Sequence, residues 1–334
     1  MTHSARPAPL VPGRPVGNSP DLRLDSPGVG LGSVGLLEYD FPGVRIGTAE
    51  YPAGPTGCTV IEFPRLCRTA VDQRGGAVGM SGGFPWNHAV CLTGGSTFGL
   101  AAGTGVIDEM LRRGGYDVGF DRLPVVSSAV VYDFGPRDNA VHPDAELGRA
   151  ALRNAVEGRA AFGRVGAGIS TSVGKLDLAR AEFAGQGVAF GQTGDASVLV
   201  VTVVNAVGVV VDRSGRVVRG NLDPDTGERS HPAAGYAAQL ARGVSGPQPR
   251  GVTANTTITC VVTDVDLDDR ELNQFARQVH GSMNRGIQPF NTGGDGDVLF
   301  AVTTGGVPPL PGTLTALGSV ASELTWDAVL NAVV

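Results

Sequence analysis

Lysine is almost absent from this chain. The sequence has 26 lysine and arginine residues, and Lys175 is the one lysine among them. Aromatic residues make up 6% of the chain, and no apolar run reaches the roughly 20 residues that a membrane-crossing helix needs. The longest apolar stretch, residues 198–211, is dominated by valine and predicts buried β-strands. We therefore expect no membrane partner.

Clustered cysteines, spaced metal ligands and basic patches are also missing. The four cysteines, Cys58, Cys67, Cys91 and Cys260, form no C-x-x-C pair, and the five histidines show no metal-binding spacing. These patterns argue against a zinc site and against a secreted disulfide framework, so we expect no metal, no cofactor and a cytoplasmic location. The net charge of −6 without a basic patch argues against a nucleic-acid partner.

Neither a P-loop nor a serine-nucleophile elbow is expected from this sequence. Two glycine-rich segments, residues 75–83 and 92–105, lack the P-loop pattern because no G-K-[ST] follows them. We expect instead that their glycines let a helix pack closely on a sheet. The one G-x-S-x-G match, residues 79–83, is not followed by a helix pattern, which argues against an ordinary Ser-His-Asp hydrolase.

Strand and helix patterns mix along the whole chain, which predicts a single α/β domain of layered sheets and helices. Residues 1–35 are rich in proline and glycine and are expected to form a flexible tail. The end of segment 213–254 has the composition of a loop or linker. His280 is expected on the polar side of its helix. The expected strands are 44–49, 59–63, 67–71, 124–134, 182–190, 198–211, 256–262 and 298–302, and the expected helices are 106–114, 144–156, 268–287 and 314–333.

Lys175 is the first candidate for chemistry. It lies in GISTSVGKLDLAR, a segment of small residues, in a chain that uses arginine for every other basic side chain. Lysine carries a compact charge whose pKa shifts readily on burial, whereas arginine cannot be deprotonated. The position therefore suits a reaction that needs an ammonium group. The alternative is that one lysine persists by chance in a GC-biased composition.

Thr256 is the second candidate. The polar pair Thr256 and Thr257 opens an apolar strand directly after the expected linker. If Thr256 became a chain N-terminus, its own α-amine, with a pKa near ~8, would be a base beside its hydroxyl. The alternatives are an N-T-T glycosylation sequence at Asn255 and a plain beginning of a strand.

Two carboxylates and one amide complete the candidates. Asp295 and Asp297 flank Gly296 just before a strand, so they can cluster near a cation, although D-G is also ordinary turn chemistry. Asn205 lies inside the valine-rich run, where a buried amide must find hydrogen bonds. It is suited to donate to an oxyanion, or to turn a hairpin together with Gly208.

Taken together, these segments resemble the self-processing aminopeptidase and amidase family that includes β-peptidyl aminopeptidases and D-aminopeptidase. Within it the likeness is strongest to the nylon-oligomer hydrolases. The likeness runs from roughly Phe41 to Ala332. It rests on several blocks in the same order: FPGVRIG, EYPAGPTGCTVI, RGGAVGMSGG, VSSAVVYDF, VVRGNLDPDTG, NTTIT, ELNQFARQVHGSMNRGIQPF, DGDVLFAVTT and ASELTWDAVL.

The resemblance implies an N-terminal-nucleophile hydrolase with a layered αββα sandwich fold, made as an inactive precursor. The chain would cut itself between Asn255 and Thr256. The products would be a larger α-chain, residues 36–255 after the tail, and a smaller β-chain, residues 256–334, both in one fold. The resemblance makes Thr256 the nucleophile, implies a homotetramer, and places these further residues in the site: Lys175, Asn205, Asp295 and Asp297 in catalysis, and Tyr132 in substrate binding.

The activity that the resemblance implies is internal cleavage of linear 6-aminohexanoate oligomers through an acyl-enzyme. The alternatives are an aminopeptidase or amidase for β-peptides or D-amino-acid amides, an acyltransferase, and an unprocessed relative without activity. One position departs from the family pattern, because relatives often carry histidine where this chain has Asn291. Cys260 is on the same strand face as Thr256 and is expected to pack in the core.

Replacing Lys175 by arginine tests the argument from the lone lysine. We expect Lys175→Arg to lose most of its self-cleavage or turnover, because a planar and permanently charged guanidinium cannot take the place of an ammonium. Gel electrophoresis follows the first property and an amide-hydrolysis assay the second. A variant with normal rates of both would contradict the argument.

Overall fold

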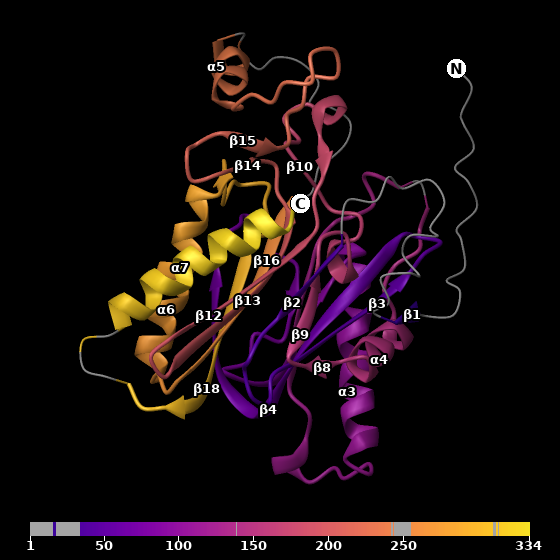
Figure 1. Ribbon diagram of the computed structural model, residues 1–334. Helices are drawn as coiled ribbons and strands as arrows, with labels where there is room; N and C mark the ends of the chain where they lie inside the picture. The colour runs from indigo at the N-terminus through magenta and orange to yellow at the C-terminus, as the bar shows by residue number, and fades with distance from the viewer. Residues whose placement is uncertain are drawn as a thin grey trace.

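The computed structural model describes residues 34–137, 139–241, 243, 255–309, 312 and 314–334, together with the backbone of Val16–Gly17. Its central element is an 11-stranded sheet (Figure 1). The main path runs through β12 (Gln186–Thr193), β13 (Ala196–Asn205), β16 (Thr256–Val265), β18 (Val298–Val307), β4 (Thr56–Gln73), β6 (Trp86–Thr93), β7 (Val126–Val130) and β5 (Met80–Ser81). Three further strands join beside β4, namely β1 (Val16–Gly17), β3 (Arg45–Tyr51) and β8 (Val156–Glu157).

Strand β4 belongs to both halves of this sheet. Its first part pairs with β3 and its last part with β18. Its pairing with β6 is irregular between Glu62 and Cys67, where a bulge lets a strand bend and twist more strongly. The half that contains β12, β13, β16 and β18 therefore folds over the half that contains β3, β6 and β7.

Helices cover the outer face of each half (Figure 1). Helices α6 (Asp269–Ser282) and α7 (Leu314–Asn331) pack on β12, β13, β18 and β4, and α3 (Ala101–Arg113) and α4 (Ala145–Arg153) pack on β3, β4, β6 and β7. Side chains fix the starts of two of them. Asp144 accepts the N–H of Leu147 at the start of α4, and a capping box between Asp268 and Glu271 begins α6.

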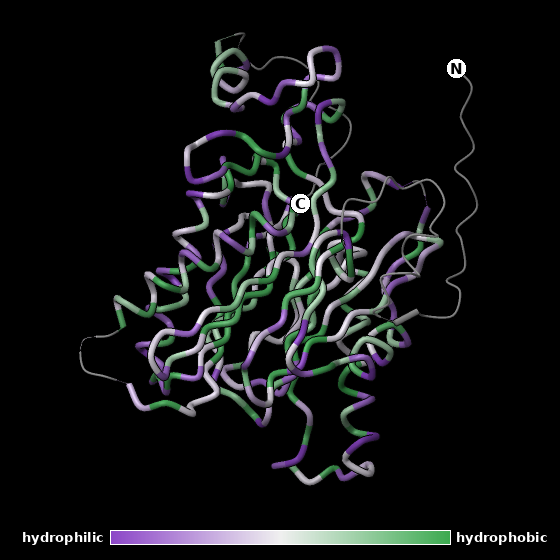
Figure 2. Tube along the Cα trace, in the orientation of Figure 1, coloured by the Kyte–Doolittle hydropathy of each residue, from purple (hydrophilic) through white to green (hydrophobic). Residues whose placement is uncertain are grey.

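Three buried apolar clusters separate the layers. The middle cluster joins the two halves of the sheet and includes Ile61 from β4 and Ile258 from β16. One outer cluster packs Val261 against Phe275 of α6, and the other contains Leu147 of α4. Figure 2 shows the hydrophobic residues concentrated along the strands. The order helix, sheet, sheet, helix is the αββα sandwich expected from the sequence, and that expectation is confirmed.

Side chains alternate along β16, and this sets the direction in which Thr256 points. Ile258 and Cys260 belong to the middle cluster, whereas Val261 and Val265 belong to the cluster under α6 and α7. By the two-residue period of a strand, Thr256 shares the face that lies between the two halves of the sheet. The expectation that Cys260 packs in the core is confirmed.

Short elements connect the layers. The described residues form three small sheets: β2 (Gly35–Glu38) with β9 (Arg159–Phe162), β10 (Ser172–Val173) with β11 (Glu182–Phe183), and β14 (Val209–Val211) between β15 (Val217–Arg219) and β17 (Ile287–Gln288). The remaining helical elements in this part of the chain are α2 (Ser96–Gly99), α5 (Ala233–Ala241), η1 (Phe120–Arg122), η2 (Gly166–Gly168), η3 (Leu178–Arg180) and η4 (Met283–Arg285).

Several expected boundaries were wrong. The predicted strands 59–63 and 67–71 are one strand, β4, and the predicted strand 124–134 ends at Val130. The valine-rich run forms two strands in separate sheets, β13 and β14. The predicted helix 268–287 ends at Ser282 and continues as the turn η4. His280 is buried rather than on the polar side of its helix, because its Nδ1 pairs with Asp72 at 3.0 Å.

The two ends of the expected larger chain lie mostly outside the described residues. Of the tail predicted over 1–35, the structure describes the paired backbone of Val16–Gly17 and the residues from 34 onward. Of segment 213–254, residues 244–254 lie outside the described part, whereas β15 and α5 form within it. The division at residue 255 stays a prediction. No helix in the described part of the chain has the length and apolar character to cross a membrane.

Glycines of α3 allow two close approaches: Gly103 lies against β7, as expected of a helix packed on a sheet, and Gly105 lies against the helix α4. A Cβ at Gly105 would collide with the backbone oxygen of Ala145, and one at Gly103 with the hydroxyl of Ser128. We expect Gly105→Ala to lower the free energy of unfolding by about 1–3 kcal/mol, since overpacking forces backbone shifts. Urea denaturation measures this change.

Gly114, just after the same helix, provides the matched control. Its φ is −77° and the nearest atom to an added Cβ is the Met110 oxygen at 3.5 Å, so an alanine fits there. Gly114→Ala should therefore change the unfolding free energy by no more than about 0.5 kcal/mol. Equal stabilities for the two variants would contradict the close-packing argument.

Candidate active site

The ends of three neighbouring strands bring four of the predicted site residues together. Thr256 begins β16 and lies opposite Asn205, the last residue of β13. On the other side of β16, the loop that leads into β18 carries Asp295 and Asp297, and Asn255 pairs with Asp295 in a parallel bridge. All of these residues are at least nine-tenths buried.

The peptide bond between Asn255 and Thr256 lies in a polar environment. The Thr256 hydroxyl is 2.5 Å from the Asn255 carbonyl oxygen, to which it donates. The same oxygen accepts the backbone N–H of Gly296 at 2.7 Å. A Cβ at Gly296 would lie 2.7 Å from Oγ1 of Thr256, so no larger residue fits this approach. The carbonyl thus has a fixed backbone donor directly beside the threonine hydroxyl.

The two carboxylates have different partners. Oδ1 of Asp297 accepts the N–H of Thr257 at 2.6 Å and Oδ2 accepts the N–H of Asn291 at 3.0 Å. Burial, and next the charge of Asp295, raise the pKa of Asp297 to about 7. Asp295 binds Thr292 through Oδ2, whereas its buried Oδ1 has no hydrogen-bond partner among the described residues. A carboxyl that titrates near neutral pH can hold or release a proton at this site.

Lys175 is buried against Asn205. Its Nζ donates to Oδ1 of Asn205 at 2.7 Å and to the Asn205 backbone oxygen at 2.9 Å. Burial lowers the pKa of the lysine to about 7, and the charge of Asp295 acts in the opposite direction. The lone lysine therefore lies in the polar cluster beside Thr256, where its charge can change near neutral pH.

The side-chain amide of Asn205 is held at both ends. Oδ1 accepts from Lys175 and from the N–H of Ser172 at 3.1 Å, and Nδ2 donates to the Tyr132 carbonyl at 3.0 Å. An amide nitrogen has two hydrogens, so one donor of Asn205 is left for another acceptor. Asn205 ends β13, and the next strand, β14, lies in a separate sheet, so the hairpin with Gly208 expected as one alternative was wrong. The role of Asn205 as a donor to an oxyanion stays a prediction.

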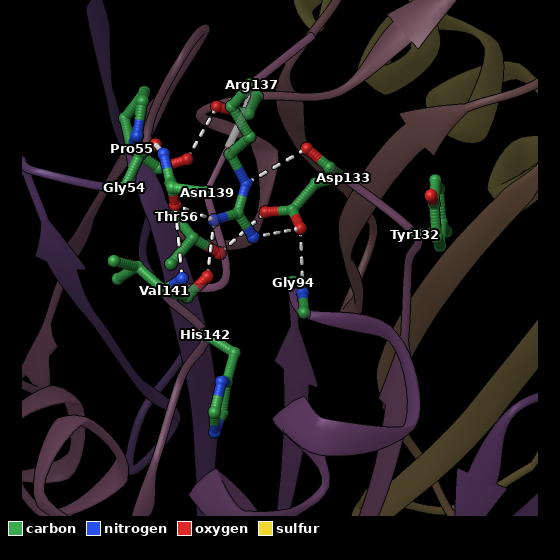
Figure 3. A network of polar contacts seen from close by, with 12 residues as sticks. Gly54, Pro55, Thr56, Gly94, Tyr132, Asp133, Arg137, Asn139, Val141 and His142 are labelled. Carbon is green, nitrogen blue, oxygen red and sulfur yellow. Dashed lines mark hydrogen bonds and ion pairs between the residues drawn. The ribbon is translucent and has the colours of Figure 1, made fainter. Parts of the chain in front are cut away.

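Tyr132 contributes its backbone rather than its phenol to this cluster. Its ring packs edge-on against Phe134, with 5.4 Å between the ring centroids. In Figure 3 the ring points away from the polar network of Asp133 and Arg137. A role for Tyr132 in substrate binding stays a prediction.

The glycine-rich segment 75–83 has a different neighbour from the one predicted. It does not let a helix pack on a sheet, because Gly75 and Gly76 lie against the loop that carries the two carboxylates. The N–H groups of Arg74 and Gly75 donate to the Asp297 carbonyl, and that of Ala77 donates to the Asp295 carbonyl. The glycines bring a neighbouring backbone onto this loop and fix it there.

The sequence interpretation missed several residues around the site. A buried network joins Thr56, Gly95 and Arg137 to the carboxylate of Asp133 (Figure 3). Nothing in the sequence pattern points to it, apart from the position of Asp133 after a strand. Among the described residues, no group of three or more His, Cys, Asp or Glu side chains is arranged to hold a metal ion.

The sequence profile of peptidase family S58 matches residues 39–334. The chain belongs to this peptidase family. The 6-aminohexanoate-oligomer endohydrolase of Paenarthrobacter ureafaciens is 52% identical to it over 337 residues, which cover 98% of this chain and 94% of the relative. The family expected from the sequence is confirmed, and with it the expectation that the chain is a hydrolase.

Solved structures support the fold assignment of this family member. A Burkholderia sp. β-aminopeptidase superposes with a TM-score of 0.63 at 19% identity, over 91% of this chain and 89% of the other. The L-aminopeptidase D-Ala-esterase/amidase of Ochrobactrum anthropi, described as a variant of the Ntn-hydrolase fold, gives 0.62 at 17% identity over 87% and 83%. At such identities the likeness shows the fold alone.

The single lysine allows a direct test of these electrostatics. In protein made with isotope-labelled lysine, one side-chain NMR signal should titrate with a midpoint at about 7. We expect Asp295→Asn to move the midpoint to lower pH, because the carboxylate favours the charged ammonium and its loss removes that support. The titration uses Thr256→Ala as its background, which removes the hydroxyl of Thr256 from every sample compared.

Asp177→Asn is the matched control for this titration. Asp177 lies two residues from Lys175 in sequence, its side chain caps the turn at Ala179, and asparagine also serves as a cap. The Asp177→Asn midpoint should equal that of the parent. An unchanged midpoint in Asp295→Asn would show that Asp295 does not act on Lys175.

Proposed function

We propose that this chain cuts itself between Asn255 and Thr256 and then hydrolyses linear 6-aminohexanoate oligomers through the new N-terminal threonine. The observation that carries the proposal is the pair of contacts on the Asn255 carbonyl, from the Thr256 hydroxyl and from the Gly296 N–H. The substrate is supported by the name and 52% identity of the Paenarthrobacter ureafaciens relative.

Chain scission begins with attack of Thr256 Oγ1 on the Asn255 carbonyl carbon. The Gly296 N–H is already directed at the oxygen that gains charge, as an oxyanion donor should be. When the C–N bond breaks, the threonine nitrogen takes the proton that the hydroxyl gives up, and an ester joins Asn255 to Oγ1. Water then hydrolyses the ester and leaves a free α-amine and a free hydroxyl on Thr256.

Turnover repeats the same chemistry on a substrate amide. The α-amine of Thr256 takes the hydroxyl proton, directly or through water, and passes it to the leaving amine of the substrate. The free N–H of Asn205 stabilises the oxyanion, and one such donor is worth about 3 kcal/mol. Asp295 and Asp297 favour the protonated amine whereas Lys175 favours the neutral one, so their balance sets the fraction of active base. Water completes the cycle by hydrolysing the acyl-enzyme.

The cellular and quaternary setting is part of the proposal. We place the enzyme in the cytoplasm, supported by four buried cysteines that are all free thiols. The processed pair is proposed to form a homotetramer, which light scattering of the purified protein measures.

Thr256→Ala tests the scission. The parent chain should give two bands, residues 1–255 and 256–334, and the smaller fragment should begin with TTITC on N-terminal sequencing. Thr256→Ala should stay in one piece and hydrolyse no amide, since it has no hydroxyl, whereas Thr256→Ser should recover part of both properties. An uncleaved parent chain that still hydrolyses amides would require another nucleophile.

The products of an oligomer assay decide among the activities. Internal cleavage of a 6-aminohexanoate oligomer releases fragments of mixed length, whereas an aminopeptidase releases single units from one end. Hydrolysis of β-alanine or D-alanine amides without cleavage of the oligomer would favour the aminopeptidase alternative. Transfer of the acyl group to an added amine, in preference to water, would favour an acyltransferase.

A further inference from the structure

The turn between β3 and β4 contacts two separate segments of the site. Thr56, the first residue of β4, is fully buried, and its hydroxyl donates to Oδ2 of Asp133 at 2.6 Å. The carbonyl of the preceding residue, Pro55, accepts the hydroxyl of buried Ser170 at 2.7 Å. Two neighbouring residues of one turn thus bind segments that are far apart in the sequence.

Asp133 fixes the segment on one side. Its Oδ1 accepts the N–H of Gly95 at 2.9 Å and pairs with the Arg137 guanidinium at 2.7 Å, and both members of this ion pair are buried (Figure 3). The preceding peptide carbonyl belongs to Tyr132 and accepts Nδ2 of Asn205. The position of that carbonyl therefore depends on how Asp133 is held.

Ser170 fixes the segment on the other side. Two residues further on, the N–H of Ser172 donates to Oδ1 of Asn205. Lys175, from the same segment, donates to the same oxygen. The two segments thus contact opposite ends of a single amide, and the turn that contains Pro55 and Thr56 binds both.

We propose that Thr56 and Ser170 are positioning residues that hold the Asn205 amide in its catalytic orientation, an inference that rests on the proposed use of Asn205 as an oxyanion donor. Neither hydroxyl touches the peptide bond that is cut. Thr56 acts through Asp133 and the Tyr132 carbonyl, and Ser170 acts through the segment of Lys175. If either support is lost, the amide can rotate and its free N–H no longer faces the developing charge, and small displacements of such groups are costly in rate.

Substitution of Thr56 and Ser170 tests this inference better than substitution of the Asp133–Arg137 ion pair. Removing Asp133 or Arg137 leaves an uncompensated buried charge and endangers folding itself. Thr56→Val and Ser170→Ala each delete one hydroxyl and leave the ion pair in place. We expect each to lower kcat about tenfold with KM within about twofold, because the amide acts on the transition state. The fold reduction in kcat of the double variant should be smaller than the product of the two single reductions, since both hydroxyls support one amide group.

Two further readouts separate positioning from general destabilisation. Thr56→Ser keeps a hydroxyl and should restore most of kcat. In Ser170→Ala the NMR titration midpoint of Lys175 should fall, because weaker contacts with the Asn205 oxygens support its charged form less well.

Thr325→Val and Ser322→Ala are the matched controls. Both residues are buried in α7, where each hydroxyl donates to a backbone carbonyl of its own helix. These controls should lose comparable thermal stability but keep kcat and the Lys175 midpoint. If Thr56→Val and Ser170→Ala equal their controls in kcat and in the Lys175 midpoint, the inference is wrong.

Failure of the proposed function gives a different result. If the parent protein, without any substitution, hydrolyses no amide, the proposed hydrolysis fails. The positioning role is then judged by the titration midpoint of Lys175 and by the rate of scission before Thr256. In that case the inference is overturned if the positioning variants match the controls in the Lys175 midpoint and in the rate of scission. A lower midpoint together with slower scission would support it.

Discussion

Backbone pairing between β13 and β16 is the constraint on which the site depends. The register aligns Asn205 with Thr256, so the last residue of one strand lies opposite the first residue of the next. Parallel pairing of β16 with β18 then brings the loop of Asp295 and Asp297 to the other side of Thr256. A shift of one residue in either pairing would turn every side chain to the opposite face and dismantle the cluster.

Burial gives this cluster its chemistry. Lys175 and Asp297 both have a pKa of about 7, the lysine lowered and the carboxyl raised, and in both cases burial is the largest cause. Asp295 acts on both groups, because its charge raises both pKa values. The αββα layers keep water out, and short polar contacts replace it around groups that change their charge near neutral pH.

The sequence predicted the parts of this site that depend on residue type and local pattern. Lys175 was found by its rarity, Thr256 by its place at the start of an apolar strand, and the two carboxylates by their position before another. The layered fold followed from the alternation of strands and helices together with a family resemblance. The contacts that support the site were not predictable in this way. Thr56 and Asp133 are 77 positions apart, Ser170 and Pro55 are 115 apart, and these contacts arise only when segments distant in the sequence come together in the fold. The Gly296 donor is a backbone group, which every residue except proline possesses, so its role carries no sequence signal.

The order of strands has a consequence for the cut that we propose before Thr256. The segment that follows Thr256 supplies β16 and β18, which lie between β13 and β4, and the helices α6 and α7 that cover them. The smaller piece from the proposed cut would therefore be the middle of the sheet rather than an appendage at its edge, and it could not leave unless the sheet split along two seams. If a molecule cut there came apart, each piece would have to find the other by diffusion before it could refold. Recovery of the cut molecule after denaturation would then depend on dilution, a property that the uncut chain does not share.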